Sequence, residues 1–249
     1  MKRLAGRVAV VTGGSRGIGR GMVKALADEG AKVWAIGRDA ARLAAVASEI
    51  AGVETLAADV TDPQTAGRVL RETRPDILIL NAGAAPHMAP IQEQSWEQFA
   101  QPWNTDVKAT FHFGKEALSM PLAPGSQVVT MSSGAGIAGS PLSGGYAGAK
   151  RMQWFMTRYL ADESRLLGRG IRFLALLPKQ ILGDTELGST AAAAYAARAG
   201  ITPEQFLERF GAPLTPDGVG QGLIALLTEA DYREGLAFGI TGKGLERLD

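Results

Sequence analysis

The sequence predicts a three-layer α/β/α fold, in which helices cover both faces of a doubly wound parallel sheet of about seven strands. Two observations carry this prediction. Short apolar runs of strand length alternate with longer segments of helical periodicity, which is typical of parallel α/β proteins. The first apolar run, residues 8–11, leads through a glycine-rich turn into a helical pattern. A chain of 249 residues suits one domain, so we expect residues 1–249 to form a single folded unit.

The composition excludes several classes of protein. The chain is 46% hydrophobic and 20% charged, with a formal net charge of +1, which gives no reason to expect a nucleic acid or an anionic membrane as partner. The run at residues 8–11 is too short for a signal peptide or a membrane span. Because there is no cysteine and only two histidines, disulfides and thiolate metal sites are excluded, no metal is expected, and a cytoplasmic location is predicted.

The glycine-rich turn is residues 12–19, Thr-Gly-Gly-Ser-Arg-Gly-Ile-Gly, and the helical pattern after it ends at Gly30. A strand, a glycine turn and a helix in this order begin a Rossmann-like dinucleotide-binding unit. Gly13 permits the tight turn, while Gly17 and Gly19 let the backbone approach a pyrophosphate at the helix N-terminus. The turn is therefore predicted to bind a cofactor through Gly13, Ser15, Arg16, Gly17, Ile18 and Gly19.

The end of the second strand, residues 32–37, bears on which cofactor fits. An acidic residue there would bind the ribose hydroxyls of NAD, whereas a basic one accommodates the 2′-phosphate of NADP. Arg38 follows Gly37 directly, and Arg16 can approach the same phosphate, so two guanidinium groups can clamp one dianion. This favours NADP(H), while the neighbouring Asp39 keeps NAD(H) as an alternative.

Two further strands and their helices follow. Residues 55–58 end at Asp59, which is placed to accept a hydrogen bond from an adenine amino group, and Asp62 then caps a helix. Residues 76–80 are predicted as the fourth strand, and they are apolar after Asp76, as a central parallel strand should be. The next helix opens with a capping box from Ser95 to Gln98 and continues to about Leu118.

The segment that carries the predicted chemistry is residues 132–150. Tyr146 and Lys150 are four residues apart, so a helix places them on one face. A nearby cation and the positive end of the helix favour the phenolate, which makes Tyr146 a candidate proton donor or acceptor. Ser133 follows the apolar strand 127–131, so it can hydrogen-bond a substrate oxygen beside Tyr146.

Together these motifs resemble the short-chain dehydrogenase/reductase family, in its single-domain branch. The resemblance rests on the glycine turn, Asp59-Val60, Asn81-Ala-Gly83, Ser133, Tyr146 and Lys150, and covers about residues 6–182. It implies hydride transfer between a nicotinamide cofactor and a carbonyl or alcohol, with Tyr146 handling the proton, Ser133 orienting the oxygen and Lys150 supporting both tyrosine and ribose. It also implies cofactor contacts from Val60, Asn81, Ala82, Gly83, Tyr146, Lys150, Pro178 and Ile181.

The chain departs from the family pattern at three places. The family's fourth catalytic residue, an asparagine that binds a water, corresponds to Asp106, which can still accept a hydrogen bond. Pro178 is followed by Lys179 rather than glycine, and Gly183 stands where the family has a threonine, with Thr185 two residues further on, so no contact from Thr185 to the cofactor is expected. The family's usual C-terminal sequence is replaced by residues 241–245.

Residues 183–213 are predicted to form a substrate lid of two short helices, one capped by Ser189 and the other spanning residues 205–210. Tyr195, Phe206 and Phe210 would give the lid an apolar lining, which suits a medium-sized hydrophobic carbonyl compound.

Aromatic residues on two long helices, at Trp103, Trp154 and Phe155, favour a homodimer or homotetramer. The predicted function is an NADP-dependent carbonyl reductase. The alternatives are an NAD-dependent alcohol dehydrogenase and a cofactor-binding protein without turnover.

Overall fold

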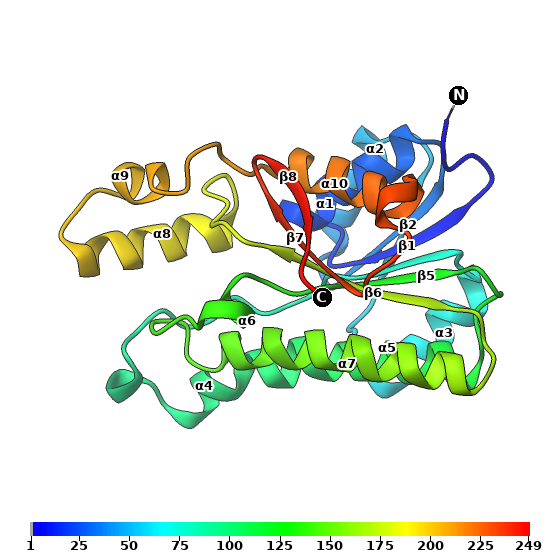
Figure 1. The fold of residues 1–249 in the computed structure, drawn as a ribbon, viewed down its shortest axis with the longest axis horizontal. Helices are drawn as coiled ribbons and strands as arrows, with labels where there is room; N and C mark the ends of the chain where they lie inside the picture. The colour runs from blue at the N-terminus through cyan, green and yellow to red at the C-terminus, as the bar shows by residue number, and fades with distance from the viewer. Residues whose placement is uncertain (1) are drawn as a thin grey trace.

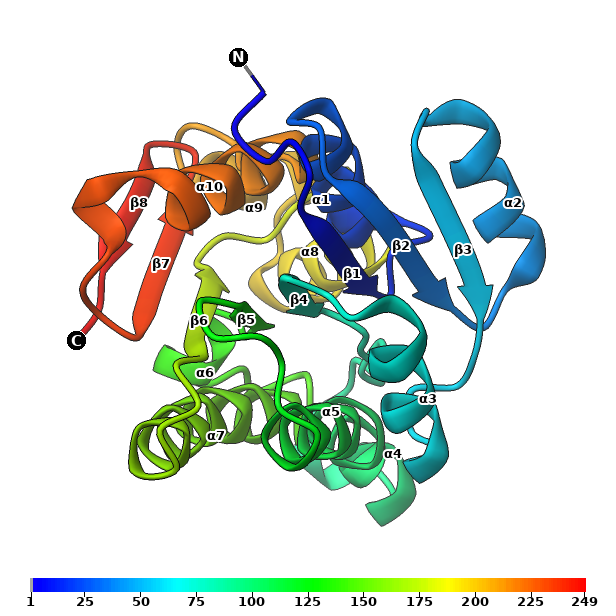
Figure 2. The ribbon, with the colours of Figure 1, turned by 90° about the vertical axis from the view of Figure 1, so that its right-hand side faces the viewer.

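The computed structural model describes residues 2–249, so Met1 lies outside the described residues. The chain forms one sheet in the order β3-β2-β1-β4-β5-β6-β7-β8. Strands β1 to β7 run parallel, and β8 pairs antiparallel with β7. Figure 2 shows the strands in this order between two layers of helices. The three-layer fold is confirmed, with eight strands among residues 2–249 rather than about seven.

The strands are short and apolar, as a sheet covered on both faces requires. In β4, Ile-Leu-Ile-Leu, all four residues are buried. The strands are β1 Val8–Thr12, β2 Lys32–Gly37, β3 Val53–Ala57, β4 Ile77–Leu80, β5 Gln127–Met131, β6 Arg172–Pro178, β7 Ala237–Thr241 and β8 Gly244–Arg247. Because β8 follows a tight turn after β7, the polar tail Gly-Leu-Glu-Arg covers the last edge of the sheet.

The helices divide between the two faces (Figure 1). The helices are α1 Gly17–Asp28, α2 Ala40–Glu49, α3 Pro63–Thr73, α4 Trp96–Pro102, α5 Lys108–Ser119, α6 Ala135–Ala138, α7 Tyr146–Leu166, α8 Glu186–Ala199, α9 Pro203–Glu208 and α10 Pro216–Thr228, with short 3-10 turns at Ile91–Glu93 and Ala230–Tyr232 and a π-helical turn at Trp103–Val107. None of the described helices is long and apolar enough to cross a membrane.

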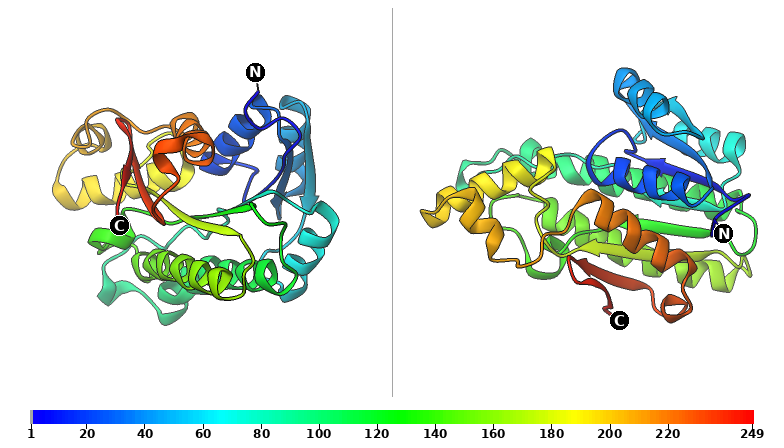
Figure 3. Two further views of the ribbon diagram at one scale, coloured as in Figure 1. Left: turned by 45° about the vertical axis from the view of Figure 1, so that its right-hand side comes forward. Right: turned by 90° about the horizontal axis from the view of Figure 1, so that it is seen from above.

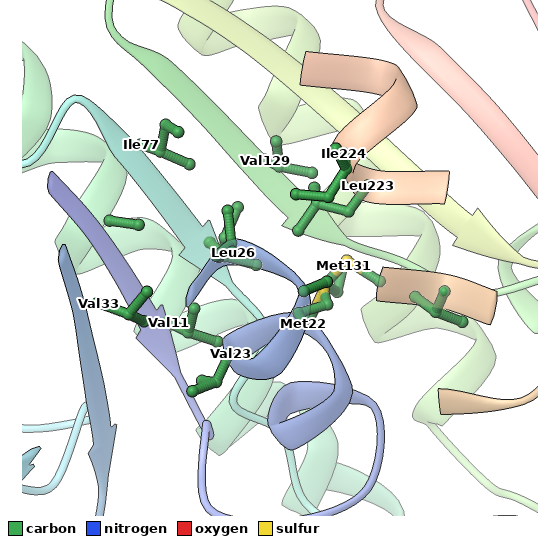
Figure 4. Packing of buried hydrophobic residues seen from close by; sticks show 14 of the residues in the cluster. Val11, Met22, Val23, Leu26, Val33, Ile77, Val129, Met131, Leu223 and Ile224 are labelled. Carbon is green, nitrogen blue, oxygen red and sulfur yellow. The ribbon is translucent and has the colours of Figure 1, made fainter. Parts of the chain in front are cut away.

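Each face of the sheet has its own hydrophobic core. On one face α1 and α10 pack on β1, β4 and β5, and Figure 4 shows Met22, Leu26 and Leu223 between helix and strand. Gly21 and Gly220 let these two helices approach closely, because a Cβ atom on Gly220 would lie 2.8 Å from the Gly21 carbonyl oxygen. On the other face α3 and α5 contribute a second cluster that includes Val69 and Phe113.

Most predicted helix starts are confirmed by their caps. Asp62 accepts from the Gln64 backbone amide, and Ser95 and Gln98 form the expected capping box. The lid differs from its prediction. Helix α8 begins at Glu186 and is capped by Thr185, because the Thr185 hydroxyl accepts from the Gly188 amide at 3.0 Å. Ser189 therefore lies inside the helix, not at its start.

The second lid helix is α9, Pro203–Glu208, which both begins and ends slightly earlier than the expected span of residues 205–210, and a capping box of Thr202 and Gln205 sets its start. Helices α8 and α9 extend beyond the carboxyl ends of the strands (Figures 1 and 3). The carboxyl ends of parallel strands are where open α/β sheets bind ligands. The glycine turn, Asn81 and Ser133 follow strands at this edge, and Pro178 is the last residue of β6 there.

Candidate active site

The glycine turn has a shape that side chains would disrupt. Gly13 and Gly17 have φ angles of 67° and 52°, in the left-handed region that favours glycine. A Cβ atom on Gly13 would lie 2.9 Å from the Cα of Ala82, and one on Gly19 would collide with the Gly13 carbonyl oxygen. Glycine at these two positions therefore lets the turn pack tightly against its own backbone and Ala82 at the start of α1, which is where a phosphate group binds in such turns.

The other predicted residues of the turn lie beside it. Ser15 lies near Gly37 at the end of β2, and Ile18 packs on the hydrophobic core. Asn81 holds the turn from the side: its side-chain amide donates to the carbonyl oxygens of Thr12 and Gly13 at 3.1 and 3.2 Å. The structure therefore fixes the glycine turn against the end of β4.

A second contact joins the same two segments. The Thr12 hydroxyl accepts from the backbone amides of Asn81 and Ala82 at 2.9 and 3.1 Å, and donates to the Ile79 carbonyl oxygen at 3.1 Å. This buried hydroxyl satisfies backbone groups where β1 and β4 separate. Asn81 and Ala82 thus lie next to the turn, as predicted.

Asp59 and Val60 follow β3, next to Ala58, whose amide donates to the Gly37 carbonyl oxygen at the end of β2 at 2.8 Å. The Asp59 carboxylate accepts from the Thr61 amide and hydroxyl at 2.9 and 2.8 Å. These hydrogen bonds, with a smaller contribution from the Arg38 charge, lower the pKa of Asp59. Asp59 is therefore an ionised acceptor, while Val60 is buried in the core. Its contact with an adenine amino group stays a prediction.

The basic residues near the turn are arranged differently from the expectation. Arg16 pairs with Glu186 of α8, and Arg42 of α2 pairs with the same carboxylate at 3.2 Å. Arg38 is exposed. The Asp39 carboxylate caps α2 by accepting from the Arg42 amide at 3.0 Å, so it already has a structural role.

Sequence reasoning missed both Arg42 and Glu186. Arg42 lies only four residues beyond Arg38, so helical spacing from the end of β2 was a usable signal. Glu186 had no such signal, because 170 residues separate it from Arg16.

The two serines after β5 have different roles. The Ser132 hydroxyl is buried and donates to the Lys150 carbonyl oxygen at 2.7 Å, which ties the end of β5 to α7. Ser133 is only half-buried, and its hydroxyl accepts from the Ala135 amide at 3.2 Å. Ser133 thus keeps a hydroxyl proton to donate, as a residue that orients a substrate oxygen must.

Tyr146 is the first residue of α7, and Lys150 lies one turn later. The Lys150 ammonium lies 5.5 Å from the centre of the Tyr146 ring and donates to the Met131 carbonyl oxygen at 3.1 Å. The predicted pairing on one helix face is therefore present. Lys150 is only 5% exposed, which is rare for a lysine without a charged partner.

That partner is Asp106, whose Oδ2 lies 2.9 Å from the Lys150 Nζ. Burial alone would lower the pKa of Lys150, but the Asp106 carboxylate and Tyr146 outweigh it and raise the pKa above its ordinary value. The two groups are in direct contact, so no water fits between these atoms. This differs from the expected hydrogen bond to a water.

Asp106 reaches Lys150 because the helix between α4 and α5 contains the π-helical turn Trp103–Val107. Such a turn rotates the following residues relative to a regular helix. Asp106 is fully buried, whereas Asn104, two residues earlier, is exposed and does not face Lys150. Gln153 of α7 donates to the Asp106 carbonyl oxygen at 3.3 Å and to the Thr110 hydroxyl at 2.7 Å.

Gly83 and Ala84 complete the surroundings of this carboxylate. The Ala84 amide donates to Oδ1 of Asp106 at 2.8 Å. A Cβ atom on Gly83 would lie 2.7 Å from Oδ2. Residue 83 must therefore be glycine, because the Asp106 carboxylate occupies the space where a Cβ atom would lie.

The chain around the end of β6 accommodates Lys179, which stands where the family has a glycine. The Pro178 carbonyl oxygen accepts from the Gly134 amide at 2.7 Å, which joins it to the Ser133 loop. The Lys179 side chain pairs with Glu246 of β8, so it is held at the sheet edge by the chain's unusual tail. Ile181 is half-buried.

Thr185 lies closer to the glycine turn than expected: a Cβ atom on Gly17 would be 3.7 Å from its methyl carbon. The start of the lid thus lies over the turn. The lid aromatics pack on one another, with ring centres of Tyr195 and Phe206 5.7 Å apart and those of Phe206 and Phe210 also 5.7 Å apart.

The lid also contacts the loop before Tyr146. The hydroxyls of Tyr195 and Ser140 are 2.6 Å apart. Beside them is a cavity of about 570 Å³, lined by Met88, Ala89, Pro90, Ile91, Gln92, Pro141, Leu142, Ala194 and Arg198. This cavity is open to solvent between α8 and the loops at residues 88–92 and 141–142, and its lining does not include Ser133, Tyr146 or Lys150.

A family model described as short chain dehydrogenase matches residues 7–195. The chain belongs to the short-chain dehydrogenase/reductase family. It is therefore an oxidoreductase that acts on CH–OH or C=O groups, and its fold is that of an NAD(P)(H)-binding enzyme.

Relatives and solved structures agree with this assignment. The chain is 32% identical to an L-fucose dehydrogenase of Bos taurus, over 96% of this chain and 90% of that protein. It is 31% identical to an L-xylulose reductase of Bos taurus, over 76% of this chain and 77% of that protein. A crystal structure of levodione reductase superposes with a TM-score of 0.83 at 25% identity, covering 96% of this chain and 98% of that one.

Proposed function

We propose that the protein is an NADP(H)-dependent oxidoreductase that reduces a carbonyl group of a small molecule, or in reverse oxidises the secondary alcohol. The observation that carries this proposal is the pairing of Tyr146 with Lys150 on α7, because the Lys150 ammonium also bonds the Met131 carbonyl oxygen, two residues before Ser133, at the carboxyl edge of the sheet. The cofactor supplies the hydride when it is bound.

The residues present fit such a cofactor. The turn leaves the start of α1 free of side chains at Gly13, Gly17 and Gly19, and a Cβ atom on Gly17 would stand in the space facing Thr185. Asp59 offers an ionised acceptor nearby. In this proposal the glycine turn binds the pyrophosphate, and Asn81, Ala82, Gly83, Pro178 and Ile181 border the rest of the cofactor.

The chain's own residues would then move the proton. Tyr146 donates a proton to the substrate oxygen in reduction, and the half-buried Ser133 hydroxyl orients that oxygen. The Lys150 ammonium stabilises negative charge on Tyr146 because it lies over the ring. Asp106 keeps Lys150 protonated in a buried site, which is a positioning and electrostatic role.

NADP(H) is favoured over NAD(H) by the basic residues around the end of β2. Arg16, Arg38 and Arg42 give this rim three guanidinium groups, which suit a phosphate dianion. The neighbouring acid, Asp39, already accepts from the Arg42 amide. NAD(H) remains the alternative because Glu186 neutralises part of this charge.

The first experiment is to follow NADPH and NADH consumption by the purified protein. The panel should contain ketones, diketones, β-keto thioesters, quinones and, given the named relatives, ketoses and aldoses. Tyr146→Phe is the control, because it removes the reacting hydroxyl while keeping the ring over Lys150. Turnover that depends on Tyr146 and prefers NADPH is the expected result.

A cofactor-binding protein without turnover is the second candidate, and the direct contact between Asp106 and Lys150 is the observation in its favour. The Asp106 carboxylate attracts the Lys150 ammonium directly, whereas the neutral asparagine that the family has at this position would not. Tight NADPH binding without turnover of any ketone or alcohol in the panel would support it against the reductase.

We also propose a homodimer or homotetramer built on α5 and α7. Phe111, Phe155, Tyr159 and Leu166 on these helices are exposed, and such apolar residues favour an interface. Trp154, by contrast, is partly covered by its own chain.

A cytoplasmic location, expected from the cysteine-free sequence, stays a prediction that cell fractionation would check.

A further inference from the structure

Three elements that are far apart in the sequence meet at the rim of the proposed cofactor cleft. Glu186 lies in the first turn of α8, Arg16 in the glycine turn, and Arg42 in the first turn of α2. The Glu186 carboxylate pairs with Arg16 through one oxygen and with Arg42 through the other, at 3.2 Å for the second pair. α8 begins beside the start of α1 (Figure 3).

This carboxylate uses both guanidinium groups in the way a phosphate would. Arginine binds carboxylate and phosphate through the same planar array of N–H donors. Arg16 and Arg42 therefore cannot give their full hydrogen bonding to a 2′-phosphate while Glu186 holds them. A phosphate dianion brought to this place would also be repelled by the Glu186 carboxylate.

The same contacts attach the lid to the cleft. Glu186 follows Thr185, which caps α8 and faces Gly17. The side chains of Glu186, Arg16 and Arg42 are 64%, 53% and 46% exposed. A single exposed ion pair would contribute little to the stability of the protein, but here one carboxylate links three elements. Because the Glu186 side chain is exposed, the free energy needed to move it from the arginines into water is small.

We propose that Glu186 is a specificity-determining residue that competes with the cofactor's 2′-phosphate for Arg16 and Arg42. Without a 2′-phosphate, as with NAD(H), the carboxylate stays on the two arginines and holds the start of the lid on the glycine turn. With NADP(H), the phosphate displaces Glu186. This rests on the proposed binding of a nicotinamide dinucleotide, and it holds whichever of the two cofactors the enzyme uses.

The test measures binding, so it does not depend on knowing the substrate. The dissociation constants of NADPH, NADH, adenosine 2′,5′-bisphosphate and 5′-AMP are measured by calorimetry for the wild type, Glu186→Gln and Glu49→Gln. Glu49 is the matched control, because it pairs with Arg20 at similar exposure but belongs to a different pair of helices, α1 and α2.

We expect Glu186→Gln to bind NADPH and adenosine 2′,5′-bisphosphate at least about fivefold more tightly, since it removes both the competitor and the repulsion. Binding of NADH and 5′-AMP should change less than about twofold, and Glu49→Gln should change none of the four. Equal effects on phosphorylated and unphosphorylated ligands, or no effect, would overturn the proposal.

A second measurement follows the lid. Hydrogen exchange of residues 183–190 should be faster in Glu186→Gln than in the wild type without ligand, and faster in wild type with NADPH than with NADH. The same exchange with both cofactors would overturn the displacement. If the wild type binds neither cofactor, the proposed function fails as well; if it binds NADH or NADPH and the mutant keeps the same ratio, only this inference fails.

Discussion

Replacing Asp106 by asparagine removes the charge that holds Lys150 in the interior while keeping the shape of the side chain. The Asp106 and Lys150 side chains are 0% and 6% exposed, and their charged atoms are 2.9 Å apart. Coulomb's law gives about 6 kcal/mol at this separation with an effective dielectric constant of about 20. Most of this attraction offsets the desolvation of two charges.

The loss in the free energy of unfolding is reduced further because the amide oxygen of the asparagine can still accept the hydrogen bond from the Ala84 amide. We therefore expect Asp106→Asn to lower the free energy of unfolding by about 2 kcal/mol at neutral pH, below the range for leaving a buried charge wholly unpaired. The family resemblance places an asparagine here, so the fold should accommodate the substitution.

The pH dependence distinguishes this cause from a general loss of packing. In the wild type the pKa of Lys150 is raised, so its stabilising contribution is full below the unfolded value of about 10.4 and is lost only as pH rises through the higher folded value. In Asp106→Asn, burial is no longer opposed by the carboxylate and lowers the Lys150 pKa. Stability of the mutant should then increase with pH, and its deficit should shrink towards about pH 10.

Urea unfolding between about pH 6.5 and 9.5, followed by the fluorescence of the four tryptophans, measures this deficit. Asp162→Asn is the control, because it breaks an exposed pair with Arg165 on the same helix; it should change stability by less than about 0.5 kcal/mol at every pH. A deficit for Asp106→Asn that is constant, or that grows with pH, would refute the reasoning.

Three other substitutions test the geometry. Asp106→Ala should lose more turnover than Asn104→Ala, because only Asp106 is buried against Lys150. If steady-state rates showed the reverse order, Asn104 and not Asp106 would be the residue that supports Lys150. Gly83→Ala should lower the unfolding free energy by about 1–3 kcal/mol in urea titrations, since its Cβ would lie 2.7 Å from the Asp106 carboxylate; unchanged stability would count against that contact. Phe155→Glu should shift sedimentation towards the monomer, whereas a wild type that is already monomeric at micromolar concentration would rule out the interface.

Much of the site was predictable because its members lie in short motifs. The glycine turn is predicted by spacing within eight residues, and Tyr146 and Lys150 by one helical turn. Ser133 was predicted because an apolar run ends just before it. Asp106 was also singled out, as the position of the family's asparagine, although the sequence did not reveal its direct contact with Lys150.

The parts that were wrong or missed have physical reasons. The last strand, β8, was not predicted because Gly-Leu-Glu-Arg has neither the length nor the apolar alternation of a strand, and it forms by pairing with the edge of β7. The start of α8 was placed too late because Ser189 and Thr185 are both good caps, and only packing over the glycine turn selects Thr185.

The sequence by itself determined the layered fold, the order of strand and helix, and the residues that meet at the carboxyl edge, because apolar periodicity and turn chemistry are local properties of the chain. The tertiary structure alone decided the interactions of charged side chains. The pairing of Asp106 with Lys150 depends on a π-helical turn, and the pairing of Glu186 with Arg16 and Arg42 depends on how the lid folds back over the cleft. Charge pairs between distant segments leave no periodic pattern in a sequence, since only packing brings their partners together.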